Sequence, residues 1–137
     1  MARMAPTDSP LVAIIDDDEP FRRSVERLVR SAGFSVETFG SAEDFLERGN
    51  LDGTACAILD MRLPGLNGFD LQRRLVTRPR PIPIVFVSAH EDAVMRANAL
   101  RAGAIAFLKK PFDDNTLLDT LHRAITYVPG GGGGKPS

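Results

Sequence analysis

The chain has 137 residues, a length that fits one domain, and its 43% hydrophobic and 26% charged residues match an ordinary globular protein. The formal net charge of −1 gives no reason to expect a nucleic acid or an anionic membrane as a partner. The single cysteine, Cys56, excludes an internal disulfide and a metal site made of several cysteines, and we expect it to be buried in a strand.

Neither end of the chain resembles a membrane or secretion segment. No apolar run approaches the roughly 18 residues that a spanning helix needs, and the N-terminal MARMAPTDSP lacks the apolar stretch of a signal peptide. We therefore expect a cytoplasmic protein without membrane contact. Residues 1–10 are expected to form a flexible arm, residues 11–128 one domain, and residues 129–137 a flexible glycine-rich tail. The tail is equally consistent with a linker cut short, an expression remnant or a natural end.

Short apolar runs are spaced along the chain and are expected to form strands. In chain order they are Leu11–Ile15, Phe34–Phe39, Thr54–Leu59, Ile82–Val87 and Ala104–Leu108. The first, third and fourth runs are almost continuously apolar, which is typical of strands buried on both faces of a parallel sheet.

Helical patterns separate the expected strands. The second helix is expected to begin at Ser41, the first and fourth to end near Gly33 and Gly103, and the fifth to be capped by Asp113 or Asp114. The expected inward faces are Phe21, Val25, Leu28, Val29 and Ala32; Phe45 and Leu46; Leu71 and Leu75; Val94, Ala97 and Leu100; and Leu117, Leu118, Leu121, Ile125 and Val128.

Strands that alternate with helices predict a parallel α/β sheet with helices on both faces. In such sheets ligands bind at the carboxyl ends of the strands. The residues expected at those ends are the acidic run 16–19 after the first strand, Asp60 after the third, Ser88 and Ala89 after the fourth, and the segment 109–111 after the fifth. Acids, a hydroxyl and an ammonium group are therefore expected to converge on one edge.

The chemistry of this edge favours a cation and a phosphoryl group over a nucleotide. The chain has neither a GxGxxG nor a Walker A sequence, and carboxylates after the first strand would repel a phosphate. Clustered carboxylates instead suit magnesium. Asp60 is then a candidate to accept a phosphoryl group, with Ser88 and Lys110 as partners for its oxygens.

Four motifs on these predicted strand ends carry a family resemblance: VAIIDDDEP, LDMRLPGLNG, FVSAH and FLKKPF. With these four motifs in this order, the chain resembles the receiver domain of bacterial two-component response regulators. It looks most like the FixJ-like subgroup. The likeness covers about residues 12–128. It implies a single flavodoxin-like (βα)5 domain whose parallel strands have the order 2-1-3-4-5.

The resemblance assigns a metal and acceptor role to the acids. Asp60 matches the phosphoacceptor, Asp17 the direct magnesium ligand, and Asp16 an acid that acts through water. A backbone carbonyl two residues past the acceptor, here that of Arg62, is the third metal contact in this family. Residues 18–19 are then expected at a helix N-terminus, where the helix dipole favours acids.

The resemblance also assigns phosphoryl and switch roles. Ser88 matches the switch hydroxyl, and Ala89 the small residue that leaves room for the phosphoryl group. Lys110 matches the family lysine, followed by a cis peptide bond to Pro111. Phe107 matches the aromatic switch residue, which would turn inward as Ser88 moves toward the phosphoryl group.

Each role has a structural alternative. Asp60 is otherwise a strand-end acid that begins a turn, and Asp16 with Asp17 a solvated acidic cap. The Ser88 hydroxyl is otherwise bonded to local backbone, and Phe107 is otherwise a core residue. Arg62 and His90 either flank the acyl phosphate and influence how fast water reaches it, or are exposed polar residues. His90 and His122 are not spaced as a metal pair.

The expected function is a response regulator receiver that takes a phosphoryl group from a sensor histidine kinase onto Asp60 with magnesium. It is not an enzyme, but it promotes its own phosphotransfer and slow autodephosphorylation. Phosphorylation is expected to change the face of the fourth helix, fifth strand and fifth helix, which contacts partners or a second receiver in a homodimer. The output is transcription, through a DNA-binding domain outside this chain, or protein contact by a stand-alone receiver, without nucleic acid contact by this chain.

Two other classes compete with this function. A binding module could keep the fold without the chemistry, although intact acids, serine and lysine argue against it. A magnesium-dependent hydrolase with an aspartyl nucleophile is the other, but the segment 60–62 lacks the second acid of the DxDxT pattern that such phosphatases resemble.

Overall fold

Five parallel strands form one sheet in the order β2-β1-β3-β4-β5. This computed structural model describes residues 9–90 and 92–126. The strands are β1 (Leu11–Ile15), β2 (Ser35–Phe39), β3 (Thr54–Asp60), β4 (Ile84–Ser88) and β5 (Ala106–Lys109). The predicted topology is thereby confirmed, and no strand end differs from the expected one by more than two residues.

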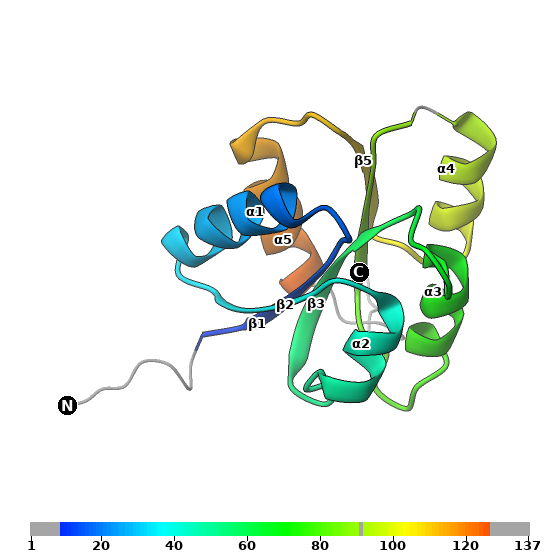
Figure 1. Cartoon of the computed structure of the whole chain (residues 1–137), viewed down its shortest axis with the longest axis horizontal. Coiled ribbons are helices and arrows are strands. Elements are labelled where there is room, and N and C mark those ends of the chain that lie inside the picture. The colour runs from blue at the N-terminus through cyan, green and yellow to red at the C-terminus, as the bar shows by residue number, and fades with distance from the viewer. Residues whose placement is uncertain (1–8, 91, 127–137) are drawn as a thin grey trace.

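The helices are α1 (Glu19–Ser31), α2 (Ala42–Arg48), α3 (Gly68–Val76), α4 (Ala93–Arg101) and α5 (Asp114–Thr126). Figure 1 shows α1 and α5 on one face of the sheet and α2, α3 and α4 on the other. Within the described residues, no helix is long and apolar enough to cross a membrane. The expected N-terminal arm and C-terminal tail lie outside the described residues, apart from Ser9 and Pro10.

Helix boundaries follow from local hydrogen bonds that the sequence largely predicts. The Ser41 side chain accepts from the backbone N–H of Asp44 at 3.0 Å, which confirms it as the cap of α2. Gly33 and Gly103 end α1 and α4 with φ of 99° and 108°, a region that favours glycine. Asp113 lies directly before α5, as expected.

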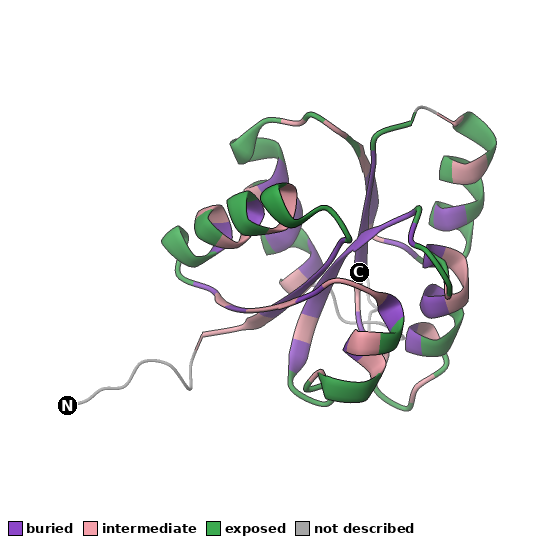
Figure 2. Ribbon diagram, viewed as in Figure 1, coloured by how far each residue is buried: buried purple, intermediate pink, exposed green. Residues whose placement is uncertain are grey.

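A buried apolar layer lies on each face of the sheet, and Figure 2 marks the buried residues along the strands and on the helices that cover them. One layer joins α1 and α5 to the sheet through Val25, Val29 and Leu121. The other joins α2, α3 and α4 to it through residues such as Phe45 and Leu71. Strands β1, β3 and β4 contribute to both layers, so their ends are held firmly in place.

The inward face of α4 differs from the prediction. Val94 and Leu100 are 70% and 40% exposed, and Ala97 is also exposed. Ala99 is buried instead, and Met95 packs against the same core. The apolar residues of α4 occur all round the helix, so their spacing does not single out one face. The face that is buried is the one where the small side chain of Ala99 fits against the sheet.

Candidate functional site

The register of the sheet brings the motif residues to one edge. Because Ile15 pairs with Leu59, the residues that follow them, Asp16 and Asp60, lie side by side at the carboxyl ends of β1 and β3. Ser88 ends the neighbouring strand β4. The predicted convergence of acids and a hydroxyl at this edge is therefore present in the fold.

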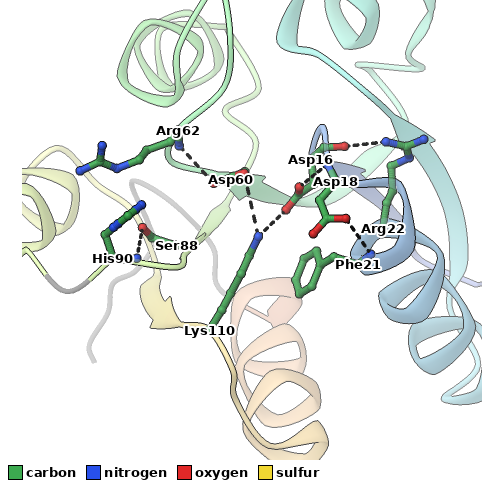
Figure 3. A network of polar contacts seen from close by, with 9 residues as sticks. All are labelled: Asp16, Asp18, Phe21, Arg22, Asp60, Arg62, Ser88, His90 and Lys110. Atoms are coloured by element: carbon green, nitrogen blue, oxygen red, sulfur yellow. Dashed lines mark hydrogen bonds and ion pairs between the residues drawn. The ribbon is translucent and has the colours of Figure 1, made fainter.

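Lys110 completes this edge from the segment after β5. Its Nζ lies 2.8 Å from Oδ2 of Asp16 and 3.9 Å from Oδ2 of Asp60 (Figure 3). The backbone N–H of Lys110 donates to the Ser88 carbonyl at 2.7 Å, which fixes where the side chain starts. The Lys110 side chain is 17% exposed and that of Asp16 is 1% exposed, so this ion pair is sheltered from water.

Asp60 has a carboxyl group that holds its proton unusually well. Its pKa is raised from 3.8 to about 6, chiefly by burial, and the carboxylates of Asp16 and Asp17 act in the same direction. The backbone N–H of Arg62, which donates to Asp60 Oδ1 at 3.1 Å, and the Lys110 ammonium act in the opposite direction. A cation at this site would relieve the repulsion among the three carboxylates.

Asp16, Asp17 and Asp60 can act together on a metal ion. Each offers a carboxylate oxygen, and the three oxygens lie within 4.8 Å of one another. Hard oxygen donors of this kind fit Mg²⁺, which usually keeps several waters. Asp17 is exposed, which leaves water access on one side, whereas Asp16 and Asp60 are buried. The residues present therefore fit the cation that the sequence predicts.

Backbone and side-chain contacts hold Asp16 in place. Its Oδ1 accepts from the backbone N–H of Asp18 at 2.9 Å, and its backbone carbonyl accepts from Arg22 Nη1 at 2.7 Å. Asp18 caps α1 and Glu19 begins it, as expected for acids beside a helix N-terminus. One carboxylate oxygen and the backbone carbonyl of Asp16 are thus both held by hydrogen bonds.

Three further predicted site residues, Arg62, Ser88 and His90, lie on the other side of Asp60 from Asp16 (Figure 3). Ser88 is 1% exposed, and its Oγ accepts from the backbone N–H of His90 at 3.1 Å. Ala89, His90 and Arg62 are exposed around the edge. Phe107 is only 4% exposed and packs 6.2 Å from Phe86, ring centroid to ring centroid, so its side chain points into the core.

Two residues of the site were missed by sequence reasoning. The helical pattern placed Phe21 on the core face of α1, where it does pack, but its ring also lies against the Lys110 ammonium group, 3.9 Å from Nζ to the ring centroid. Arg22, which bonds to the Asp16 carbonyl, carried no motif signal. The only feature of the sequence that could have indicated their role is their position in the first helical turn after the acidic run. The Lys110–Pro111 peptide bond is cis, as the resemblance implied.

Comparison with known proteins shows which family the chain is similar to. A family model described as the response regulator receiver domain matches residues 12–122. Nodulation protein W of Bradyrhizobium diazoefficiens is 44% identical over 111 residues, which cover 81% of this chain and 49% of that protein. Transcriptional regulatory protein FixJ of Rhizobium meliloti is 34% identical over 117 residues, 85% of this chain and 57% of that protein. The chain thus spans about half the length of these curated relatives.

Solved structures share the fold. The crystal structure of FixJ-N superposes with a TM-score of 0.79 at 32% identity and covers 88% of this chain and 97% of that one. The low-resolution structure of the response regulator StyR has a TM-score of 0.78 at 45% identity and covers 85% of this chain and 59% of that one.

Proposed function

Because the chain belongs to the response regulator receiver domain family, we propose that Asp60 accepts a phosphoryl group from a sensor histidine kinase. The observation that carries the proposal is the position of the Asp60 carboxylate, which lies beside Asp16 and 3.9 Å from the Lys110 ammonium. An Asp60 oxygen forms a bond to phosphorus as the bond from phosphorus to the kinase imidazole breaks. The imidazole leaves with the electron pair of that bond.

Side chains around Asp60 stabilise the transferred group. Lys110 moves its ammonium from the carboxylates toward a phosphoryl oxygen, where it forms a charge-assisted hydrogen bond. The Ser88 hydroxyl exchanges its local contact for a hydrogen bond to another phosphoryl oxygen. Ala89 has no side chain beyond its methyl group, so it leaves room for the phosphoryl group. Arg62 and His90 flank the acyl phosphate and limit the approach of water, which keeps autodephosphorylation slow.

Magnesium is the proposed cofactor. Asp17 and Asp60 would bind the ion directly, Asp16 would bind it through water, and the backbone carbonyl of Arg62 would supply a further oxygen. When bound, magnesium would supply neutralisation of the negative charge that gathers between acceptor and donor. The support is the set of three carboxylate oxygens within 4.8 Å of one another.

Phosphorylation adds about −1.5 to −2 charges at neutral pH. Ser88 follows the new charge, and Phe107 shifts with it between two arrangements that exist before phosphorylation. The face of α4, β5 and α5 then changes and contacts a partner or a second copy of the chain in a homodimer. We place the protein in the cytoplasm, where its output is transcription or protein contact.

Intact mass after incubation with magnesium and acetyl phosphate tests the acceptor. We expect a gain of one phosphoryl group in the wild type and in the control Asp119→Asn, an exposed acid on α5, and no gain in Asp60→Asn. No gain in the wild type, with acetyl phosphate or with a phosphorylated histidine kinase, would favour a binding module. Repeated turnover of small phosphate esters would favour a hydrolase.

A further inference from the structure

The Lys110 ammonium group is held from three sides. Two sides are the carboxylates of Asp16 and Asp60, at 2.8 and 3.9 Å. The third is the ring of Phe21 from the first turn of α1, whose centroid lies 3.9 Å from Nζ. Figure 3 shows the ring beside the end of the lysine side chain. An aromatic face at this distance attracts a cation through its quadrupole.

Partial burial makes this contact significant. A cation–π contact is weak when it is exposed to water and becomes markedly stronger when it is desolvated. The Lys110 side chain is 17% exposed and its partner Asp16 is 1% exposed, so the ammonium has lost much of its water. Phe21 itself is half-buried and cannot turn away freely, because its ring also packs against Phe112 at 6.0 Å and 86°.

The space around the Lys110 side chain is too open to hold its ammonium group in place by itself. Phe21, Leu28, Lys110 and Phe112 line an open groove of about 680 Å³ between α1 and the start of α5. The lysine stem has four rotatable carbons, and each ordered rotamer of such a side chain costs entropy. Without an attractive surface on the α1 side, the side chain can swing into this groove and leave Asp60.

We propose that Phe21 is a positioning residue for phosphotransfer, whose ring face holds the Lys110 ammonium beside Asp16 and Asp60. The proposal rests on the proposed function of Asp60 as acceptor. The ring acts through Lys110 and does not touch the phosphoryl group. It keeps the cation within reach of Asp60, so that a short movement brings it to a transferred phosphoryl oxygen.

The rival explanation is that Phe21 is only a packing residue that joins α1 to Phe112. Phe21→Leu keeps apolar bulk but removes the ring face, whereas Phe21→Tyr keeps the ring face at this half-buried position. Phe112→Leu is the matched control, because it removes the other ring of the pair while its apolar bulk still packs against Phe21 and keeps that ring on Lys110. A packing role predicts similar losses in Phe21→Leu and Phe112→Leu.

The first test is the initial rate of phosphorylation by acetyl phosphate with magnesium, followed by intact mass. We expect a loss of roughly threefold to tenfold in Phe21→Leu, within the range of a cation–π contact, and less than twofold in Phe21→Tyr and Phe112→Leu. In a Lys110→Met background, Phe21→Leu should change the rate less than twofold. An equal loss in both backgrounds, or a Tyr variant as slow as the Leu variant, would overturn the proposal.

A second test does not depend on phosphotransfer. The ε-CH2 protons of Lys110 should show an upfield ring-current shift by NMR in the wild type and in Phe112→Leu, and lose it in Phe21→Leu. Unshifted protons in the wild type would overturn the positioning role, even if Asp60 is phosphorylated. A wild type with shifted protons that takes no phosphoryl group would instead overturn the proposed function, and with it the reactive role of the ring.

Discussion

Asp60 is the proposed phosphoacceptor, and its buried carboxylate also lowers the stability of the fold. Burial raises the pKa of its carboxyl from 3.8 to about 6, so the folded chain binds this proton more tightly than the unfolded chain does. Stability therefore falls as the pH rises through this interval, and the cost is fully present above about pH 6. Below about pH 4 the carboxyl is protonated in both states and the cost disappears.

Asp60→Asn should therefore stabilise the metal-free fold. The amide keeps an oxygen for the Arg62 N–H, which donates at 3.1 Å, and removes the buried charge. We expect a gain in unfolding free energy on the order of 2 kcal/mol at pH 7.5 that fades toward pH 4, measured by urea denaturation with a chelator. The exposed control Asp119→Asn should show no such gain, and an unchanged Asp60→Asn at pH 7.5 would contradict this account of the site.

The acids after β1 should differ in their response to magnesium. A ligand that binds only the folded state raises the melting temperature, so we expect millimolar Mg²⁺ to raise it in the wild type. Asp17→Asn should lose the shift because it removes a proposed ligand. Asp18→Asn should keep it, because asparagine caps a helix as well as aspartate does and Asp18 is not among the clustered acids. A thermal shift assay decides, and equal responses of the two variants would argue against the assignment.

Among the elements, α4 is held by contacts that its own sequence does not reveal. Gln72 of α3 is 2% exposed, and its Nε2 donates at 3.1 Å to the carbonyl of Ala99. The backbone N–H of Ala104 donates to that same carbonyl at 3.1 Å. The last turn of α4 is thus tied to both α3 and the start of the β5 segment, while Val94 stays exposed.

Substitutions on the two sides of α4 should differ in how much they destabilise the fold. Ala99 is fully buried, so Ala99→Leu should overpack the core and lower the unfolding free energy by about 1–3 kcal/mol. Leu100→Ala, at a 40% exposed position, should change it by less than about 0.5 kcal/mol. Urea denaturation measures both changes. A larger loss of unfolding free energy in Leu100→Ala than in Ala99→Leu would mean that the face predicted from the spacing is the buried one.

For the whole molecule, Cys56 reports on global unfolding. It lies in the central strand β3 with 0% exposure, and burial raises the pKa of its thiol to about 12. The thiolate is the reactive form, so the folded protein should resist alkylation at neutral pH. Only opening of the central sheet, which requires the global free energy of unfolding, should expose it.

Alkylation of Cys56 should be slower in the folded protein than in denaturant by about a thousandfold or more. Mass spectrometry after timed labelling measures the rate. Asp119→Cys in a Cys56→Ala background provides the exposed control and should be labelled quickly in both conditions. Rapid labelling of Cys56 in the native protein would mean that β3 opens locally.

The strand ends and helix caps were predictable because they rest on short-range rules. Apolar runs followed by Asp60 and Ser88 place those residues at the carboxyl edge of any parallel α/β sheet, and Ser41 caps the next helix by bonding three residues ahead. The motifs alone therefore predicted which side chains meet at this edge of the sheet.

Only the tertiary structure decided the contacts between residues that no local rule connects. The Phe21 ring meets the Lys110 ammonium across 89 positions of the chain, and the Gln72 amide meets the Ala99 carbonyl across 27. The buried side of α4 was likewise decided by the tertiary structure. Ala99 is buried and Leu100 is exposed because only the smaller side chain fits against the sheet. Periodicity tells which residues share a face of one element, whereas close packing of all elements together determines which face is buried and which side chain meets a distant charge.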